Sequence, residues 1–268
     1  MSTPTISQKN PDLQGISESA LDLFSISQRF GDARCVNDAP YIVIPPQNGR
    51  PGFVYQASCH NWLCPRCGQM EAAKHYARIV NGAERLAEDG HSLYFVTLTC
   101  RGADMPLDVA QLDYLKWTNR LLTRMRDNTK RAGGHWSYAQ VTERQKRLHP
   151  HSHIICSSAP KDVFTIWDNP DRYYDVMERI NAEIPQKMQF AYYHHEEHYE
   201  TEMCSYWLMK ASVRVGLGVQ ARISKIASPV GVATYVSKYL FKDAIFTEWP
   251  KNWRRVRYSR SWPKLPER

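Results

Sequence analysis

Residues 149–155 read His149-Pro150-His151-Ser152-His153-Ile154-Ile155 and combine alternating histidines with an apolar end. On a β-strand, residues two apart point to the same face, so His151 and His153 would present adjacent imidazoles. Ile154 would then face the other side, where an apolar side chain can anchor the strand. We therefore expect a buried strand that carries a pair of potential metal ligands.

The residues before this strand predict its pairing partner. Residues 136–143 have the composition of a strand, and a short basic connection, 144–148, joins them to the histidines. This arrangement is typical of an antiparallel hairpin, which would bring Glu143 close to His151 and His153. Two neutral imidazoles and one carboxylate, with open positions, suit Mg²⁺ or Mn²⁺ acting as a Lewis acid.

Hydrophobic periodicity predicts alternating strands and helices along the rest of the chain. Strands are expected at 93–100 and 149–156, helices at 68–89, 107–131 and 230–242, a helical region up to about residue 186, and a strand pair within 213–226. This order predicts an α+β domain in which flanking helices pack on a central antiparallel sheet. Cys100, Cys156 and Cys204 lie in apparent core elements and are expected to be buried as ordinary hydrophobic residues.

Composition divides the chain into four regions. A polar segment, 1–34, precedes a loop-rich, Cys-rich module with a basic helix, 35–90. A central domain spans 91–245, and a basic, aromatic tail occupies 246–268. Within the first region, 21–26 is apolar enough to form a short helix.

The overall composition excludes several classes of protein. The chain has 268 residues, of which 43% are hydrophobic, and 35 Lys and Arg outnumber 27 Asp and Glu to give a net charge of +8. These values exclude a collagen, a coiled coil and a wholly disordered chain. No apolar run is long enough to span a membrane, and the start of the chain lacks the apolar stretch of a signal peptide. We expect a cytoplasmic protein without a membrane partner.

The tail concentrates positive charge. Residues 251–268 contain seven basic residues and one acidic residue, interleaved with Trp253, Tyr258 and Trp262. Basic groups neutralise phosphates and aromatic rings stack on bases, so the tail is a candidate nucleic-acid contact. The alternative is a solvated extension anchored by a few aromatic residues.

Three cysteines lie within nine residues. Cys64 and Cys67 form a Cys-x-x-Cys pair, which presents half of a tetrahedral zinc site on one turn. Cys59 offers a third sulfur, and Cys35 is the only upstream cysteine available as a fourth ligand. Four protein ligands leave no open position, so the zinc would be structural. The alternative, a set of reduced buried cysteines, is favoured over disulfides because the cysteine count of seven is odd.

Residues 235–239 read Tyr235-Val236-Ser237-Lys238-Tyr239. On a helix, Tyr235 and Tyr239 are four residues apart and share a face, with Lys238 beside them. Two tyrosines that merely cover the edge of a core would show the same spacing. A different pattern, His-x-x-Glu-His at 194–198, formally matches some zinc peptidases, but its flanks lack amphipathic periodicity and favour a solvated polar stretch.

Taken in order, these motifs resemble those of the HUH endonucleases, which initiate rolling-circle replication. Residues 95–99 resemble the first family motif, a buried strand, 149–153 resemble the metal-binding strand, and 235–239 resemble the nucleophile helix. The Cys-rich segment and basic helix at 59–78 are similar to the N-terminal region of plasmid and phage members.

The sequence departs from the family in two places. Ser152 stands where the family usually has an apolar residue, and 210–226 matches no family motif.

The resemblance implies an HUH/RRM-like fold and a mechanism. A tyrosine would attack the scissile phosphodiester to form a 5′-phosphotyrosine and release a 3′-OH that primes a polymerase. Tyr239 and Tyr235 would alternate as nucleophiles, or Tyr239 would act alone as in single-tyrosine plasmid initiators. Lys238 would stabilise the phenolate or the phosphate, and the covalent link would allow strands to be rejoined without ATP.

The implied partners are single-stranded origin DNA and a host DNA polymerase in a bacterial cell. The sequence contains no ATP-binding glycine-lysine loop, so a host helicase is expected to unwind the duplex. Alternatives remain open: a transposase-like or relaxase-like strand transferase, a zinc-containing regulator that binds nucleic acid without cutting it, and a metallopeptidase at 194–198.

Overall fold

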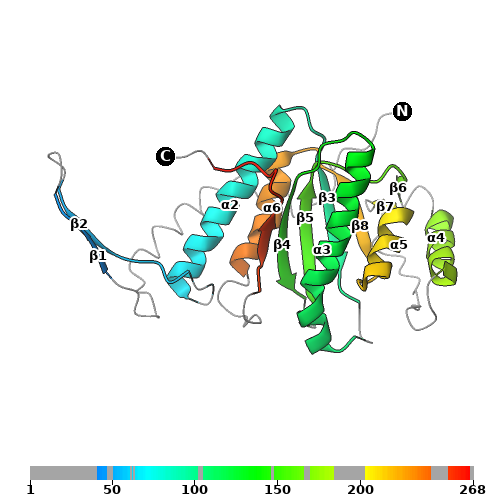
Figure 1. The fold of residues 1–268 in the computed structure, drawn as a ribbon, viewed down its shortest axis with the longest axis horizontal. Helices are drawn as coiled ribbons and strands as arrows, with labels where there is room; N and C mark the ends of the chain where they lie inside the picture. Colours follow the sequence, from blue (N-terminus) through cyan, green and yellow to red (C-terminus); the bar gives the residue numbers. More distant parts are fainter. Residues whose placement is uncertain are drawn as a thin grey trace.

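A five-stranded antiparallel sheet forms the centre of the molecule (Figure 1). The computed structural model describes residues 41–46, 51–60, 62, 64–101, 105–145, 148–165, 170–183, 203–242 and 253–265. In chain order, the strands of the sheet are β3 (Tyr94–Thr99), β4 (Tyr138–Arg144), β5 (Pro150–Cys156), β8 (Ala221–Lys225) and β9 (Val256–Tyr258). They lie in the spatial order β8-β3-β5-β4-β9, which puts the histidine strand in the middle. The predicted α+β class is confirmed.

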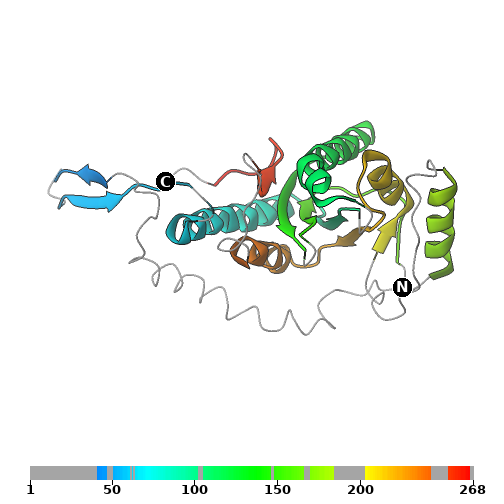
Figure 2. The same cartoon turned by 90° about the horizontal axis from the view of Figure 1, so that it is seen from below.

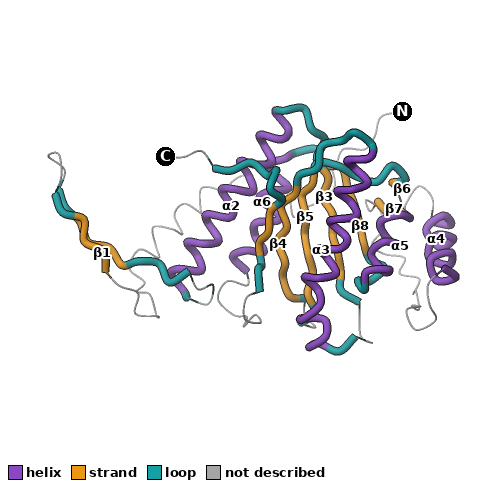
Figure 3. The backbone as a smooth tube through the Cα atoms, viewed as in Figure 1, coloured by secondary structure: helices purple, strands orange, loops and turns teal. Residues whose placement is uncertain are grey.

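Helices cover both faces of this sheet (Figures 2 and 3). The helices α2 (Pro65–Glu88) and α6 (Pro229–Lys242) pack on one face, and α3 (Leu107–Arg131) and α5 (Tyr206–Val215) pack on the other. A further helix, α4 (Pro170–Glu183), packs beside α5. The alternation of side chains along the strands supplies both cores. Val96 and Ile154 belong to the core under α3, whereas Phe95 and Ile155 face α2 and α6.

The long helices follow the predicted pattern closely. The helix α3 has the predicted bounds, and it buries residues such as Tyr114 and Leu121 at helical spacing against the sheet. It ends before Gly133, whose φ of 72° lies in the left-handed region that glycine tolerates. The helix α2 begins at Pro65, a favoured residue in the first turn because its missing N–H would have no helical partner there.

The prediction of a strand pair within 213–226 is wrong. The first part of this segment ends α5, and only β8 is a strand. The Ser205 side chain accepts from the N–H of Leu208 and starts the helix, and Gly216, with a φ of 109°, ends it. Val213 and Val215 favour strands in isolation, but their burial against the core stabilises the helix.

The prediction of a solvated tail is wrong for residues 253–265. The strand β9 pairs with β4 and forms one edge of the sheet. Trp262 is 2% exposed and lies against Gly82 of α2, where a Cβ would come within 2.2 Å of the indole nitrogen. The same indole N–H donates to the carbonyl of Arg78 at 3.2 Å. This part of the tail is therefore a structural element of the domain.

Two smaller sheets lie outside this core. The strands β1 (Tyr41–Ile44) and β2 (Phe53–Gln56) pair as a hairpin within the module that was expected to consist of loops. The strands β6 (Val163–Thr165) and β7 (Met203–Ser205) pair beside α5. The expected helix at 21–26 lies outside the described residues. Among the described helices, none combines the length and apolarity needed to cross a membrane.

Candidate functional site

The central hairpin brings the three predicted metal ligands together. Antiparallel pairing of β4 with β5 sets Glu143 opposite His151 and Val141 opposite His153. The ligand atoms of Glu143, His151 and His153 all lie within 4.8 Å of one another. His153 Nε2 lies 3.1 Å from Glu143 Oε1, and all three side chains are buried. A carboxylate and two imidazoles are a donor set that fits a divalent cation.

The surroundings of His151 favour the form that binds metals. Its Nδ1 lies 3.2 Å from the Thr99 hydroxyl and 3.1 Å from the Gln145 side-chain nitrogen, and these contacts orient the ring. Burial lowers the pKa of His151 to about 3, with a smaller contribution from the neighbouring His153. His151 is therefore neutral at physiological pH and keeps a lone pair for coordination.

Both predicted tyrosines lie on the face of α6 that covers this cluster. The Tyr239 ring stacks on His153 with 4.2 Å between the ring centroids, and the Tyr235 ring meets His153 edge-on at 6.2 Å. The Tyr239 hydroxyl donates to the Tyr235 hydroxyl at 2.7 Å. Phe95, from the first motif, stacks on His153 as well, with 5.6 Å between the ring centroids. Lys238 lies on α6, but its side chain is outside the described residues.

Ser152 has a structural explanation on the opposite face of the sheet. Its hydroxyl lies 2.8 Å from the Gln140 side-chain nitrogen and 2.9 Å from the Thr142 hydroxyl. All three side chains are fully buried, so they must satisfy one another's hydrogen bonds. This network joins β4 to β5 directly behind the histidines and supports their register.

A buried arginine that the sequence analysis missed connects the tyrosine helix to the sheet. Arg255 is 1% exposed, and its guanidinium donates to the carbonyl oxygen of Tyr239 at 3.0 Å. Its own carbonyl accepts from the N–H of Thr142, the residue before Glu143, at 2.8 Å. The guanidinium also lies over the Trp62 ring, 4.8 Å from the centroid. Arg255 thus contacts the segments that carry the tyrosines, the carboxylate and the cysteines. Its position within a basic tail gives no signal of this role.

The cysteine cluster forms where α2 begins. The sulfurs of Cys59, Cys64 and Cys67 lie within 4.8 Å of one another. The N–H of Cys67 donates to Cys64 Sγ at 3.4 Å, and the N–H of Cys59 donates to Cys67 Sγ at 3.4 Å. Such N–H donors, together with a helix N-terminus, favour thiolates, the form that binds a metal. The predicted fourth ligand, Cys35, lies outside the described residues.

The remaining cysteine predictions are confirmed where they can be examined. Cys100, Cys156 and Cys204 are buried in the core under α3 and α5. None of the six cysteines that the structure describes takes part in a disulfide. The possible peptidase motif at 194–198 lies outside the described residues.

An aromatic stack links the cysteine cluster to the C-terminal strand. Trp62, His75 and Tyr258 stack in series, with ring centroids 5.6 and 5.7 Å apart. The Arg78 guanidinium covers the Tyr258 ring at 3.9 Å. Burial lowers the pKa of His75 to about 4, so its ring enters the stack uncharged. The two clusters are therefore parts of one packed unit.

The fold and this centre define an α+β protein whose sheet presents a carboxylate and two imidazoles beneath a pair of tyrosines. The chain belongs to the ORF2-type family of replication-associated proteins, whose model matches residues 93–244. The match includes the hairpin and α6, whereas the cysteine cluster and β9 lie outside it. Membership links the protein to DNA replication and implies that it binds DNA. No curated protein gives a significant match to the chain.

Proposed function

We propose that the protein is an HUH-type initiator that nicks single-stranded origin DNA for rolling-circle replication. The observation that carries the proposal is the stacking of Tyr239 on His153, within the cluster formed with Glu143 and His151. A hydroxyl nucleophile, a cluster of ligands for a hard cation and family membership in replication together favour phosphodiester cleavage over DNA binding alone.

In the proposed reaction, the Tyr239 oxygen attacks the scissile phosphorus. An oxygen–phosphorus bond to the tyrosine forms as the bond to the 3′ oxygen breaks, which leaves a 5′-phosphotyrosine and a free 3′-OH. The phenol loses one proton and the departing 3′ oxygen gains one. A divalent cation held by the Glu143 cluster, Mg²⁺ or Mn²⁺, would supply a Lewis acid for the phosphate oxygens. Lys238 is the proposed partner of the developing negative charge.

Tyr235 is the proposed second nucleophile. Its hydroxyl is the acceptor for the Tyr239 hydroxyl, so both oxygens lie close to the same place above His153. A second tyrosine could attack a later phosphodiester while the first still holds the DNA, and the bond energy is kept for rejoining. A host polymerase would then extend the 3′-OH, and a host helicase would unwind the duplex.

The three cysteines are proposed to bind a structural zinc ion, with Cys35 as the candidate fourth ligand. Thiolate donors suit zinc, and a site of four protein ligands would stabilise the start of α2 rather than take part in the reaction.

The proposal is tested by incubating the protein with single-stranded origin DNA and Mn²⁺, followed by a denaturing gel that detects a covalent protein–DNA adduct. The double substitution Tyr235→Phe/Tyr239→Phe should abolish the adduct, since it removes both hydroxyls with little change in volume. Tyr94→Phe is the matched control, because Tyr94 packs against the core under α3, on the other face of the sheet. Normal adduct formation by the double variant would refute tyrosine catalysis.

The same gel separates the alternatives. A zinc-containing regulator would bind DNA without forming any adduct. A strand transferase of transposase or relaxase type would form the adduct but act on a different DNA sequence from a replication origin.

A further inference from the structure

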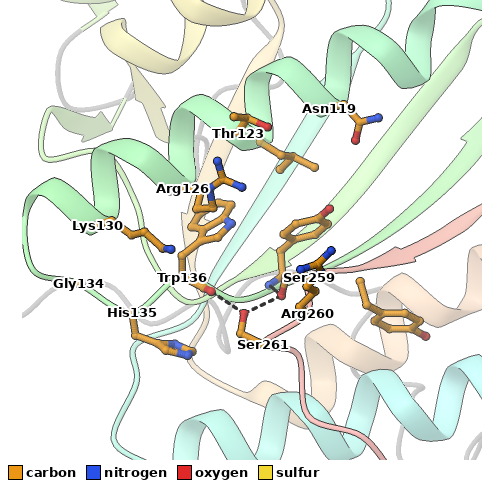
Figure 4. A pocket seen from close by; sticks show the side chains of 13 residues that line it. Asn119, Thr123, Arg126, Lys130, Gly134, His135, Trp136, Ser259, Arg260 and Ser261 are labelled. Carbon is orange, nitrogen blue, oxygen red and sulfur yellow. Dashed lines mark hydrogen bonds between the residues drawn. The ribbon is translucent and has the colours of Figure 1, made fainter.

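A cavity of about 740 Å³ lies at the β4–β9 edge of the sheet, beside α3. One wall is a face of α3 that includes Arg126 and Lys130, and the other is the turn after β9 that carries Arg260 (Figure 4). The floor comes from Trp136 and Tyr138, at the start of β4. These two rings contribute to the core under α3, whereas His153 faces α6. The cavity and the candidate nicking centre therefore lie on opposite faces of the sheet.

The side chains that line the cavity offer positive charge and hydroxyl groups. No Asp or Glu is among the lining residues that the structure describes. Arg126 pairs with the neighbouring Asp127 at 2.9 Å, so the principal cations are the exposed Lys130 and Arg260. Burial, together with the stacked His91, lowers the pKa of His135, which contributes a neutral ring.

The positive charge continues along the exposed side of α3. Between residues 116 and 131 this helix has six basic residues and one acidic residue, Asp127. Residues 119–130, which form the wall, span about 17 Å at ~1.5 Å per residue, so a wall of this length faces several successive phosphates of a nucleic acid.

Hydrogen bonds hold the wall that carries Arg260 in place. The Ser261 hydroxyl donates to the carbonyl of Trp136 at 2.7 Å, and the N–H of Tyr138 donates to the Ser259 hydroxyl at 3.0 Å. The backbone on both sides of Arg260 is therefore fixed against the start of β4. A cation that is positioned before binding loses less conformational entropy when it meets a ligand.

The available groups favour a phosphate backbone over unpaired bases. Single strands bind to aromatic rings on which bases stack, but Trp136 is only 7% exposed and the Tyr258 ring is covered by Arg78. A duplex keeps its bases stacked and presents phosphates alone. We propose that this cavity binds the phosphate backbone of duplex DNA adjacent to the single-stranded segment that is nicked on the opposite face.

This inference rests on the proposed nicking function only for what lies on the other face. Its test compares Lys130→Gln/Arg260→Gln with a control, Lys161→Gln/Lys225→Gln, which removes the same charge. Lys161 and Lys225 are both exposed; Lys161 follows β5 and Lys225 ends β8, the opposite edge strand. Fluorescence anisotropy measures the affinity of each full-length protein for a duplex of about 20 base pairs at roughly 50 to 200 mM salt.

The cavity variant should bind the duplex about tenfold more weakly at ~0.1 M salt, and its slope of log K against log salt should fall by about two, because two phosphate contacts are lost. The control should change by much less. Adduct formation with a short single-stranded oligonucleotide should be unchanged, since both substitutions lie on the face of the sheet opposite α6.

An unchanged salt slope would overturn the inference, as would an equal loss in the control or a loss confined to single strands. Failure of the nicking proposal has a different signature: the wild-type protein would form no adduct, while the difference in duplex binding between the two variants would still be measurable.

Discussion

The Glu143 cluster and the Cys59 cluster have the same compactness but opposite chemistry. In each, three ligand atoms lie within 4.8 Å of one another. The first offers oxygen and nitrogen donors in the middle of the sheet, directly below two tyrosine hydroxyls. The second offers three sulfurs at the start of α2. Hard cations that keep open positions prefer the first set, and closed structural zinc sites prefer the second.

The comparison teaches that proximity of ligands alone does not distinguish a reactive centre from a structural one. The distinction comes from the donor atoms and from what lies beside them. Tyr239 stacks on the first cluster, whereas the second is followed by the helix that it begins. The family match covers the first cluster and excludes the second, which agrees with a reactive centre in the shared domain and a stabilising addition before it.

The largest effect is expected from removing a ligand of the first cluster. His151→Ala or His153→Ala should reduce adduct formation by more than about 100-fold, because even neighbours of metal ligands commonly cost ~10 to 100-fold. Binding of single-stranded DNA, measured by anisotropy, should largely survive. His149→Ala is the control, since His149 lies on the same stretch but contacts the carbonyl of Met105. Normal cleavage by either variant with Mg²⁺ or Mn²⁺ would remove the distinction between the clusters.

Single tyrosine substitutions sharpen the description of the first cluster. Tyr239→Phe should lower the rate of adduct formation by about 100-fold, a loss typical of a group that acts in the transition state. Tyr235→Phe should still nick but fail to transfer strands. Rates of nicking and of rejoining, followed on one labelled oligonucleotide, separate the two steps. Full strand transfer by Tyr235→Phe would leave a single-tyrosine enzyme.

The second cluster should respond in stability instead of chemistry. Cys64→Ser or Cys67→Ser should release zinc and lower the free energy of unfolding by several kcal/mol, on the order of 3, because bound structural zinc contributes directly to folding. Elemental analysis and thermal unfolding measure these effects, with Cys204→Ser, in the core beside α5, as a comparison that changes stability without changing metal content. Purified protein that contains no zinc, with its thiols reacting rapidly, would contradict the assignment.

The smallest effect is expected at the residue that joins the two regions. Arg255→Lys keeps the charge but shortens the reach to the Tyr239 carbonyl, and a hydrogen bond from a charged group is worth about 1.5 to 3 kcal/mol. We expect adduct formation at saturating DNA to fall about fivefold to tenfold with unchanged DNA affinity. Arg254→Lys, at the exposed neighbouring position, is the matched control. Identical kinetics of the two variants would show that Arg255 only packs.

Local patterns were sufficient for the elements of the candidate site. Alternation predicted that His151 and His153 share a face, a short basic connection predicted the hairpin that brings Glu143 to them, and a spacing of four predicted that the tyrosines lie on one side of α6. The segment 213–215 was assigned wrongly because its β-branched residues favour strands, while the capping residues and the core determine a helix.

The sequence by itself therefore determined which residues carry the chemistry and which short-range neighbours they have, since strand alternation and helical spacing act over a few residues. Only the tertiary structure decided that a tyrosine ring lies on His153, that Arg255 reaches the Tyr239 carbonyl, and that the tail becomes β9. These contacts join segments far apart in the chain, and they form because buried surfaces and buried polar groups must find partners in the packed core. No local periodicity encodes which distant partner that will be.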